Sequence, residues 1–167
     1  MTNRELVRDL MTVGVLSCSP DIPIAAVAQS LLENELEGVI VLDHAGHAVG
    51  VITQDELVRA YAWDNWQNLT AGEIMRDDVP QFPPDIQLTA AAQLMLDRGI
   101  RIAFMMHNAA GIIYPAAVLT YRHFLRHLAA QKDVDLQDLG IEAVRQAPVD
   151  VFKRKRDAAL RRIQQQE

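Results

Sequence analysis

Apolar and polar residues follow a regular pattern along the first 130 residues, and this pattern predicts short helices and buried strands. Apolar residues at i, i+3, i+4, i+7 and i+8 predict a helix with one buried face, formed by Ile24, Val27, Ala28, Leu31 and Leu32. Asp21 is the expected N-cap of this helix. A short strand is expected before it at 13–17. The apolar runs at 39–42 and 49–52 are typical of buried strands joined as a hairpin. A second helix should run from Thr53 to about Trp66.

The same pattern returns further along the chain at a nearly constant spacing. Asp9-Leu10-Met11 returns as Glu73-Ile74-Met75, 64 residues later. Gly50-Val51-Ile52-Thr53 matches Ala117-Val118-Leu119-Thr120, 67 residues later. One change of offset indicates two copies with a single short insertion in a hairpin. Two units are too few for a solenoid, so they should pack on each other and leave a ligand site at their seam.

The chain therefore divides into repeat one (1–66), repeat two (67–131) and a tail (132–167) with expected polar helices. The protein is acidic, with a net charge of −6, although residues 150–167 hold six basic and three acidic side chains. This charge argues against nucleic acid or an anionic membrane as a general partner. One cysteine and the lack of a long apolar segment favour a cytoplasmic protein without a membrane span.

The repeated motifs resemble the CBS-domain pair, also called a Bateman module. Copy one opens with Asp9-Leu10-Met11-Thr12 and closes with Gly50-Val51-Ile52-Thr53-Gln54-Asp55-Glu56. The resemblance covers about residues 5–130. It implies an α/β (α+β) fold in which two tandem β-α-β-β-α repeats pack with pseudo-twofold symmetry, followed here by the helical tail. It also implies a homodimer and an adenosine-type ligand (AMP, ADP, ATP or S-adenosylmethionine) in clefts between the repeats.

In copy two, the resemblance assigns Thr120 to the phosphate end of a ligand cleft, and Arg122 supplies a cation there. His123 stands where the family has an aspartate that holds the ribose hydroxyls. A histidine cannot reproduce the bidentate grip of a carboxylate on a diol. By family position, the walls of this cleft are Val79, Pro80, Ile100 and Ile102.

In copy one, the corresponding residues are Thr53 and Glu56, with Asp55 where a cation would help. The walls by family position are Val15, Leu16, Gly38 and Ile40. Thr53-x-x-Glu56 also has the form of a capping box, in which the two side chains cap a helix reciprocally. A cap alone would account for both residues without any ligand.

Two functions follow as hypotheses. The first is a regulatory module that binds an adenosine-type ligand and signals to an unknown protein partner in trans. The alternative is a dimerisation or interaction scaffold that has lost nucleotide binding. We expect no enzyme activity, because no nucleophile with an adjacent base can be identified. His123 and His127 lack a third ligand, so neither a metal site nor a tightly bound cofactor is expected.

Overall fold

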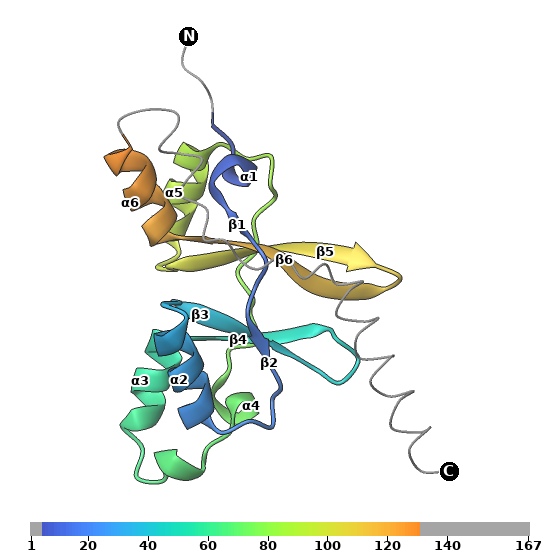
Figure 1. The fold of residues 1–167 in the computed structure, drawn as a ribbon, viewed down its shortest axis with the longest axis vertical. Coiled ribbons are helices and arrows are strands. Elements are labelled where there is room, and N and C mark those ends of the chain that lie inside the picture. Colours follow the sequence, from blue (N-terminus) through green and yellow to red (C-terminus); the bar gives the residue numbers. More distant parts are fainter. Residues whose placement is uncertain (1–4, 131–167) are drawn as a thin grey trace.

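Two three-stranded sheets face each other at the centre of the molecule, and helices cover the outer side of each sheet (Figure 1). The computed structural model describes residues 5–130, so the predicted tail helices lie outside the described residues. One sheet has the strand order β2–β3–β4, and the other has the order β1–β6–β5. The strands are β1 (Thr12–Val13), β2 (Ser17–Cys18), β3 (Gly38–Leu42), β4 (Ala48–Thr53), β5 (Ile102–Ala109) and β6 (Ile112–Thr120).

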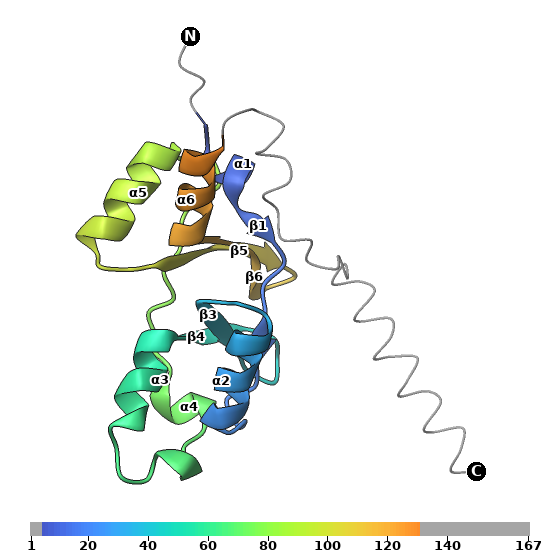
Figure 2. The same cartoon turned by 60° about the vertical axis from the view of Figure 1, so that its left-hand side comes forward.

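Four longer helices form the outer layers, two on each sheet (Figure 2). They are α2 (Ile24–Glu33), α3 (Gln54–Tyr61), α5 (Leu88–Asp97) and α6 (Tyr121–Ala129). Two single-turn helices, α1 (Val7–Leu10) and α4 (Ala71–Ile74), open the two copies, and a 3-10 turn spans Trp66–Asn68. The predicted α/β (α+β) arrangement of two packed repeats is thereby confirmed.

The continuous apolar runs arise because each sheet is buried on both faces. Successive side chains of a strand point to opposite faces. In β3, Val39 and Val41 pack under the helices, whereas Ile40 packs against the opposite sheet. Ile102 and Phe104 of β5 meet Ile40 across the seam. A strand with one solvent-exposed face alternates apolar and polar residues. Strands buried on both faces lack this alternation.

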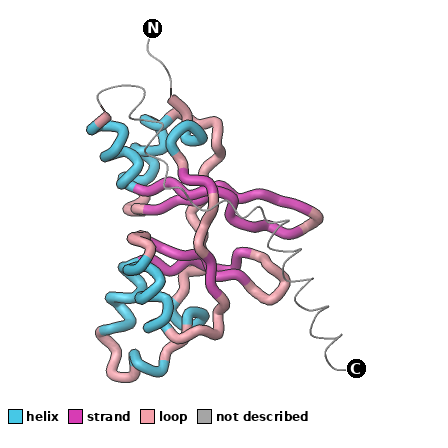
Figure 3. The backbone as a smooth tube through the Cα atoms, viewed as in Figure 1, coloured by secondary structure: helices cyan, strands magenta, loops and turns pink. Residues whose placement is uncertain are grey.

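The two packed halves exchange their opening segments. Val7 of α1 is buried in the core of the second repeat, and β1 pairs with β6 (Thr12 opposite Val118). In return, Ala71 of α4 is buried in the core of the first repeat. Figure 3 shows the resulting crossing, in which the chain passes from one sheet to the other between β1 and β2. The repeats in the sequence therefore do not coincide with the halves that pack in space.

Three local expectations differ from the structure. The strand expected at 13–17 is split into β1 and β2, because its two ends join different sheets. The N-cap of α2 is Pro23 and not Asp21, which lies in the preceding turn. Helix α3 ends at Tyr61, earlier than Trp66. The chain then turns so that Trp66 packs on a small cluster with Leu69 and Ala60.

Gly50 is expected to be essential for the packing of α4 on the first sheet. The segment after α4 crosses β4, where the Val51 and Arg76 backbones exchange hydrogen bonds of 2.9 Å. A Cβ at Gly50 would lie 2.9 Å from the Arg76 carbonyl oxygen and 2.6 Å from Met75 Sδ. We expect Gly50→Ala to lower the free energy of unfolding by about 2 kcal/mol, measured by urea denaturation.

Gly99→Ala is the matched control for this substitution. Gly99 has a φ of +62°, and a Cβ there would meet no atom of residues 5–130 within 4 Å. This control therefore measures backbone strain alone, expected at about 1 kcal/mol. A loss at Gly50 no larger than the loss at Gly99 would contradict the steric role.

Candidate functional site

The larger of two clefts at the seam has a volume of about 510 Å³ and lies beside the first turn of α6. The connection from β1 to β2 forms one wall through Gly14, Val15 and Leu16. Ile102 and Phe104 of β5 form an apolar floor. The polar end carries Thr12, Thr120, Arg122, His123 and Arg126. The cleft thus joins an apolar interior to a charged rim, which also holds Glu35 and Glu37, and its volume is typical of small-molecule sites.

His123 closes the inner end of this cleft through hydrogen bonds made by both ring nitrogens. The Thr120 backbone N–H donates to His123 Nδ1 over 2.9 Å, which completes a capping box at the start of α6. Because Nδ1 accepts that bond, the proton lies on Nε2, which donates to Thr12 Oγ1 over 2.8 Å. His123 therefore serves the fold and presents no free acceptor to a ribose.

The His123 ring is held neutral. Only 5% of this residue is exposed, and this burial lowers its pKa to about 4, with the positive charges of Arg126 and Arg122 adding to the shift. Protonation would also remove the Nδ1 lone pair that accepts the Thr120 N–H. The imidazole is consequently a fixed, uncharged part of the cleft at neutral pH.

Arg122 spans the mouth of the larger cleft from α6 to the opposite repeat. Its Nη1 donates to Glu35 Oε2 over 3.3 Å, and Glu35 lies in the turn after α2. Both side chains are substantially exposed, so the pair contributes little to stability. The guanidinium remains near the polar end of the cleft, where it can meet an anion.

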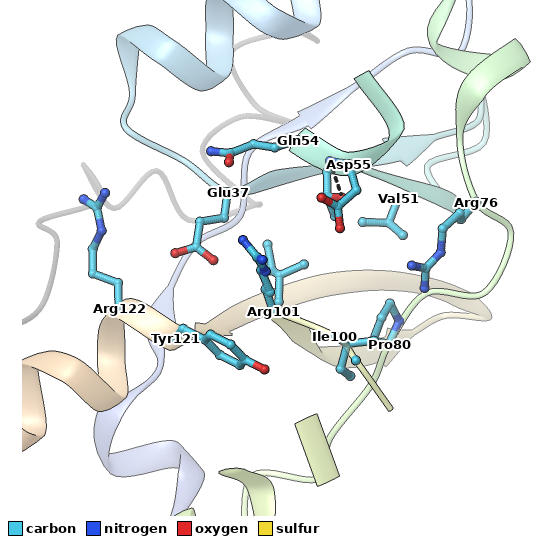
Figure 4. A pocket seen from close by; sticks show the side chains of 13 residues that line it. Glu37, Val51, Gln54, Asp55, Arg76, Pro80, Ile100, Arg101, Tyr121 and Arg122 are labelled. Carbon is cyan, nitrogen blue, oxygen red and sulfur yellow. Dashed lines mark hydrogen bonds between the residues drawn. The ribbon is translucent and has the colours of Figure 1, made fainter. Parts of the chain in front are cut away.

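The smaller cleft, of about 250 Å³, lies on the other side of the seam beside the first turn of α3 (Figure 4). Thr53 and Asp55 line it from the start of α3, and Pro80 and Ile100 form apolar walls. The Asp55 carboxylate points into the cleft. Arg76 also faces the cleft but is engaged by Asp78 in hydrogen bonds of 3.0 and 3.2 Å. This cleft is therefore smaller and carries an acid at the helix end, and Arg101 and Arg122 also line it.

Thr53 and Glu56 form a capping box, as the sequence predicts. The Thr53 N–H donates to Glu56 Oε2 over 2.8 Å, and the Thr53 hydroxyl donates to the same oxygen. Glu56 is buried, and its Oε1 lies 3.5 Å from Arg59 and 3.9 Å from Arg76. Glu56 therefore faces the interior, away from the open space of the cleft.

Glu37 lines both clefts and marks the boundary between them. Burial raises the pKa of its carboxyl group, while Arg122 and Arg101 act in the opposite direction. Figure 4 shows the Glu37 carboxylate between these two guanidinium groups. The two clefts thus share one charged cluster, and a ligand in either would alter the electrostatic potential in the other.

Most of the predicted site residues do line the clefts. However, the helix end of each copy lies beside the walls that were predicted for the other copy. The larger cleft combines Thr120, Arg122 and His123 of copy two with walls that were predicted for copy one, namely Val15, Leu16 and Gly38. The smaller cleft combines Thr53 of copy one with walls predicted for copy two, namely Pro80, Ile100 and Ile102. The predicted grouping of the walls is therefore corrected.

The exchanged opening segments cause this crosswise pairing. Gly14–Leu16 runs from β1 in the second sheet to β2 in the first, so it passes beside α6. Val79 and Pro80 likewise run between the bridges Val51–Arg76 and Gln81–Phe104, from the first sheet to the second. Each cleft consequently receives its wall from a connection that crosses the seam.

Three predicted wall or site residues occupy other places. Ile40 is fully buried in the core between the sheets and lines neither cleft. Val79 lines an open hollow of about 670 Å³ that includes Arg98 and adjoins the smaller cleft, with which it shares Arg76, Pro80 and Ile100. Glu56 is enclosed as the helix cap described above. Ile102 borders both clefts, because β5 lies at the seam.

The sequence analysis did not identify the charged residues that face each helix end from the turn of the other repeat. A comparison of the two copies at their repeat offsets could have revealed them. Glu37 and Arg101 are equivalent at the 64-residue offset, and Asp55 and Arg122 are equivalent at the 67-residue offset. Each equivalent pair has opposite charges. The larger cleft has Arg122 on its helix and Glu35 and Glu37 on its loop. The smaller cleft has Asp55 on its helix and Arg101 on its loop, and Glu37 and Arg122 border it as well. The two clefts are thus electrostatically different.

Comparisons with known proteins agree on one family. The model of the CBS domain matches residues 7–62 and again residues 71–130. A 17.7 kDa protein of Acidianus ambivalens is 30% identical over 95 residues, which is 57% of each chain. Protein MJ1426 of Methanocaldococcus jannaschii is 33% identical over 54 residues, which is 32% of each chain. The matched part therefore spans about half or less of these curated relatives.

Solved structures share the fold. A conserved protein from Pyrococcus horikoshii superposes with a TM-score of 0.67 at 15% identity, covering 80% of this chain and 98% of that chain. The CBS domain pair of protein MJ0100, crystallised with 5′-methylthioadenosine and S-adenosyl-L-methionine, superposes with a TM-score of 0.66 at 22% identity. That alignment covers 77% of this chain and 98% of the other. Within residues 5–130, no helix is long and apolar enough to cross a membrane.

Proposed function

Since the chain belongs to the CBS-domain family, we propose that it is a regulatory module without catalytic activity that binds an adenosine-type ligand at the seam between its repeats. The larger cleft is the proposed site. Arg122 lines both clefts, so the observation that carries this choice is the apolar floor of Ile102 and Phe104 beside a helix end that holds Arg122 and no carboxylate. Adenine requires the first feature, and a phosphate group favours the second.

The neighbouring structures support the class of ligand. The CBS domain pair of MJ0100 holds 5′-methylthioadenosine and S-adenosyl-L-methionine, two adenosine-containing molecules. In this chain the smaller cleft has about half the volume and places Asp55 at its helix end. A carboxylate there disfavours a phosphate group. AMP, ADP and ATP are therefore proposed for the larger cleft.

Replacement of Arg122 tests this function. We expect Arg122→Ala to weaken AMP binding about tenfold, because a charge-assisted hydrogen bond to phosphate is worth about 1.5–3 kcal/mol. Adenosine, which lacks the phosphate, should bind both proteins equally. Isothermal titration calorimetry with the full chain measures both ligands.

Arg98→Ala is the control, because Arg98 is exposed and lines neither cleft, yet its loss changes the net charge equally. AMP affinity should be unchanged in this variant. Equal losses of AMP and adenosine in Arg122→Ala would contradict a phosphate role. If none of AMP, ADP, ATP and S-adenosylmethionine binds the unmodified protein, the ligand-sensing proposal fails.

We also propose that two copies associate through their helical faces. Exposed apolar residues recur at equivalent positions of the two repeats, as Leu32 and Leu96, Val58 and Leu125, and Tyr61 and Leu128. Each of these residues is between 63% and 80% exposed. A duplicated apolar surface has the pseudo-twofold symmetry of the module itself. A second copy carries the same surface, so it is the partner that matches it.

A ligand-free scaffold is the second candidate function, and His123 favours it. The family aspartate is replaced by a buried histidine whose two nitrogens are bonded within the fold. Under this alternative the module only dimerises and presents a surface to a protein partner in trans. The calorimetric titrations above separate the two, because a scaffold would bind none of the nucleotides.

A further inference from the structure

Glu35 adopts a backbone conformation that favours glycine. Its φ is +51°, in the left-handed region. It follows α2 in a Schellman turn, where the Leu36 N–H donates to the Leu31 carbonyl and the Glu35 N–H donates to the Leu32 carbonyl. A residue with a Cβ is unfavourable at this position.

The second repeat has the same turn with the expected residue. There the Ile100 N–H donates to the Met95 carbonyl, and the Gly99 N–H donates to the Leu96 carbonyl. Gly99 is equivalent to Glu35 and has a φ of +62°. The turn therefore accommodates glycine without any change of hydrogen bonding. The strained glutamate in the first repeat calls for a reason outside the turn.

The reason lies across the seam, in the ion pair with Arg122. Glu35 Oε2 accepts from Arg122 Nη1 over 3.3 Å, and both residues line the larger cleft. The equivalent positions in the smaller cleft hold Gly99 and Asp55. An acid in the turn thus accompanies a base on the helix in one cleft. In the other cleft, where the helix has an acid, the turn has glycine.

We propose that Glu35 is a specificity-determining residue that sets the charge of the ligand accepted by the larger cleft. Its carboxylate is one counter-ion of Arg122, together with that of Glu37. A phosphate group that binds Arg122 competes with the Glu35 carboxylate for the guanidinium and is repelled by its charge. A neutral nucleoside leaves the ion pair intact and gains nothing from Arg122. Glu35 therefore lowers the affinity for weakly anionic ligands and couples phosphate binding to the turn between α2 and β3.

This inference rests on the proposed nucleotide site and is tested with Glu35→Gln. The amide keeps the shape and the backbone strain but removes the charge. AMP affinity should rise about three- to fivefold, the value expected for release of an exposed ion pair. Adenosine affinity should not change. Both are measured by titration calorimetry on the full chain at low salt, where exposed ion pairs are strongest.

Glu33→Gln is the matched control. Glu33 ends α2 two residues earlier, is exposed, and bonds only within the helix to Gln29 in the described structure. The Glu33→Gln substitution removes the same charge from the same region, and it leaves the ion pair of Arg122 unchanged. In an Arg122→Ala background, the gain in AMP affinity from Glu35→Gln should be smaller, because only the direct repulsion between Glu35 and the phosphate is then removed. These two comparisons distinguish the specific ion pair from a general change in surface charge.

Glu35→Gly separates strain from charge. It should give the same gain in AMP affinity as Glu35→Gln, together with a thermal midpoint a few degrees higher, because the left-handed turn then holds glycine.

Each outcome of these titrations has a distinct meaning. If Glu35→Gln binds AMP no more tightly than the unmodified protein does, the role of Glu35 is wrong and the nucleotide site stands. A gain of equal size in Glu33→Gln, or in the Arg122→Ala background, also overturns the proposal. If neither the unmodified protein nor Glu35→Gln binds AMP, the nucleotide site itself is wrong and the inference fails with it.

Discussion

Acidification from pH 6.5 to pH 4 is expected to lower the free energy of unfolding by about 3 kcal/mol through His123 alone. The pKa of this residue is about 4 in the folded protein, against 6.5 for an unperturbed histidine. Above pH 6.5 the ring is neutral in both states, and stability is complete. As the pH falls below 6.5, the unfolded chain takes up a proton that the folded protein excludes. The loss ends near pH 4, where the folded ring also becomes charged.

The structural cause is the closed environment of the ring. Protonated His123 would need a second acceptor at Nδ1, but that atom faces the N–H of Thr120. It would also place a buried charge beside the positive charges of Arg126 and Arg122. The cap at the first turn of α6 would be lost, whereas the Nε2–H bond to Thr12 on β1 needs no change of protonation. Acid is therefore expected to loosen the first turn of α6 first.

His123→Gln isolates this effect. Glutamine also forms capping boxes at this position of a helix, and it does not titrate. Urea denaturation of both proteins at pH 7, 6, 5 and 4, at one protein concentration, gives the comparison. The difference between them should widen by about 1 kcal/mol for each pH unit between pH 6 and pH 4. Parallel stability curves for the two proteins would contradict a neutral, buried His123.

A charge placed on the duplicated apolar surface is expected to convert the proposed dimer to a monomer. In the variant carrying Val58→Glu and Leu125→Glu, each copy brings two carboxylates to the interface. An unpaired charge buried in an apolar contact costs several kcal/mol, so the dissociation constant should rise at least about a hundredfold. Sedimentation equilibrium over a range of protein concentrations measures this constant directly.

Folding should not suffer, because Val58 and Leu125 are 71% and 64% exposed. Circular dichroism of the variant should retain the helix content of the unmodified protein. Ile113→Glu is the control, since Ile113 is also exposed but lies in the β5–β6 hairpin, on the side of the molecule opposite the helices (Figure 1). It should leave the dimer unchanged. A helix-surface variant that remains dimeric would place the interface elsewhere, and a monomeric Ile113→Glu would place it at the hairpins.

The sequence alone determined the longer helices, the two hairpins and the duplicated architecture. Apolar spacing in α2 and α5 is local information, because side chains at i, i+3 and i+4 share one face of a helix whatever surrounds it. The capping box of Thr53 and Glu56 is equally local, and the structure contains it. The repeat offsets added the pairing of two units, since neither unit could bury both faces of its sheet by itself.

Only the tertiary structure decided which segments meet. The exchange of α1 and α4 between the halves is invisible in the spacing of residues, because the pairing of Thr12 with Val118 depends on the path of the chain through space. Because of that exchange, each connection that crosses the seam forms a wall of the cleft beside the other copy's helix. Ile40 lies in the core between the sheets. The ion pair between Glu35 and Arg122 joins residues 87 positions apart. Such long-range contacts follow from how two sheets stack, whereas sequence patterns record only the faces that each element presents.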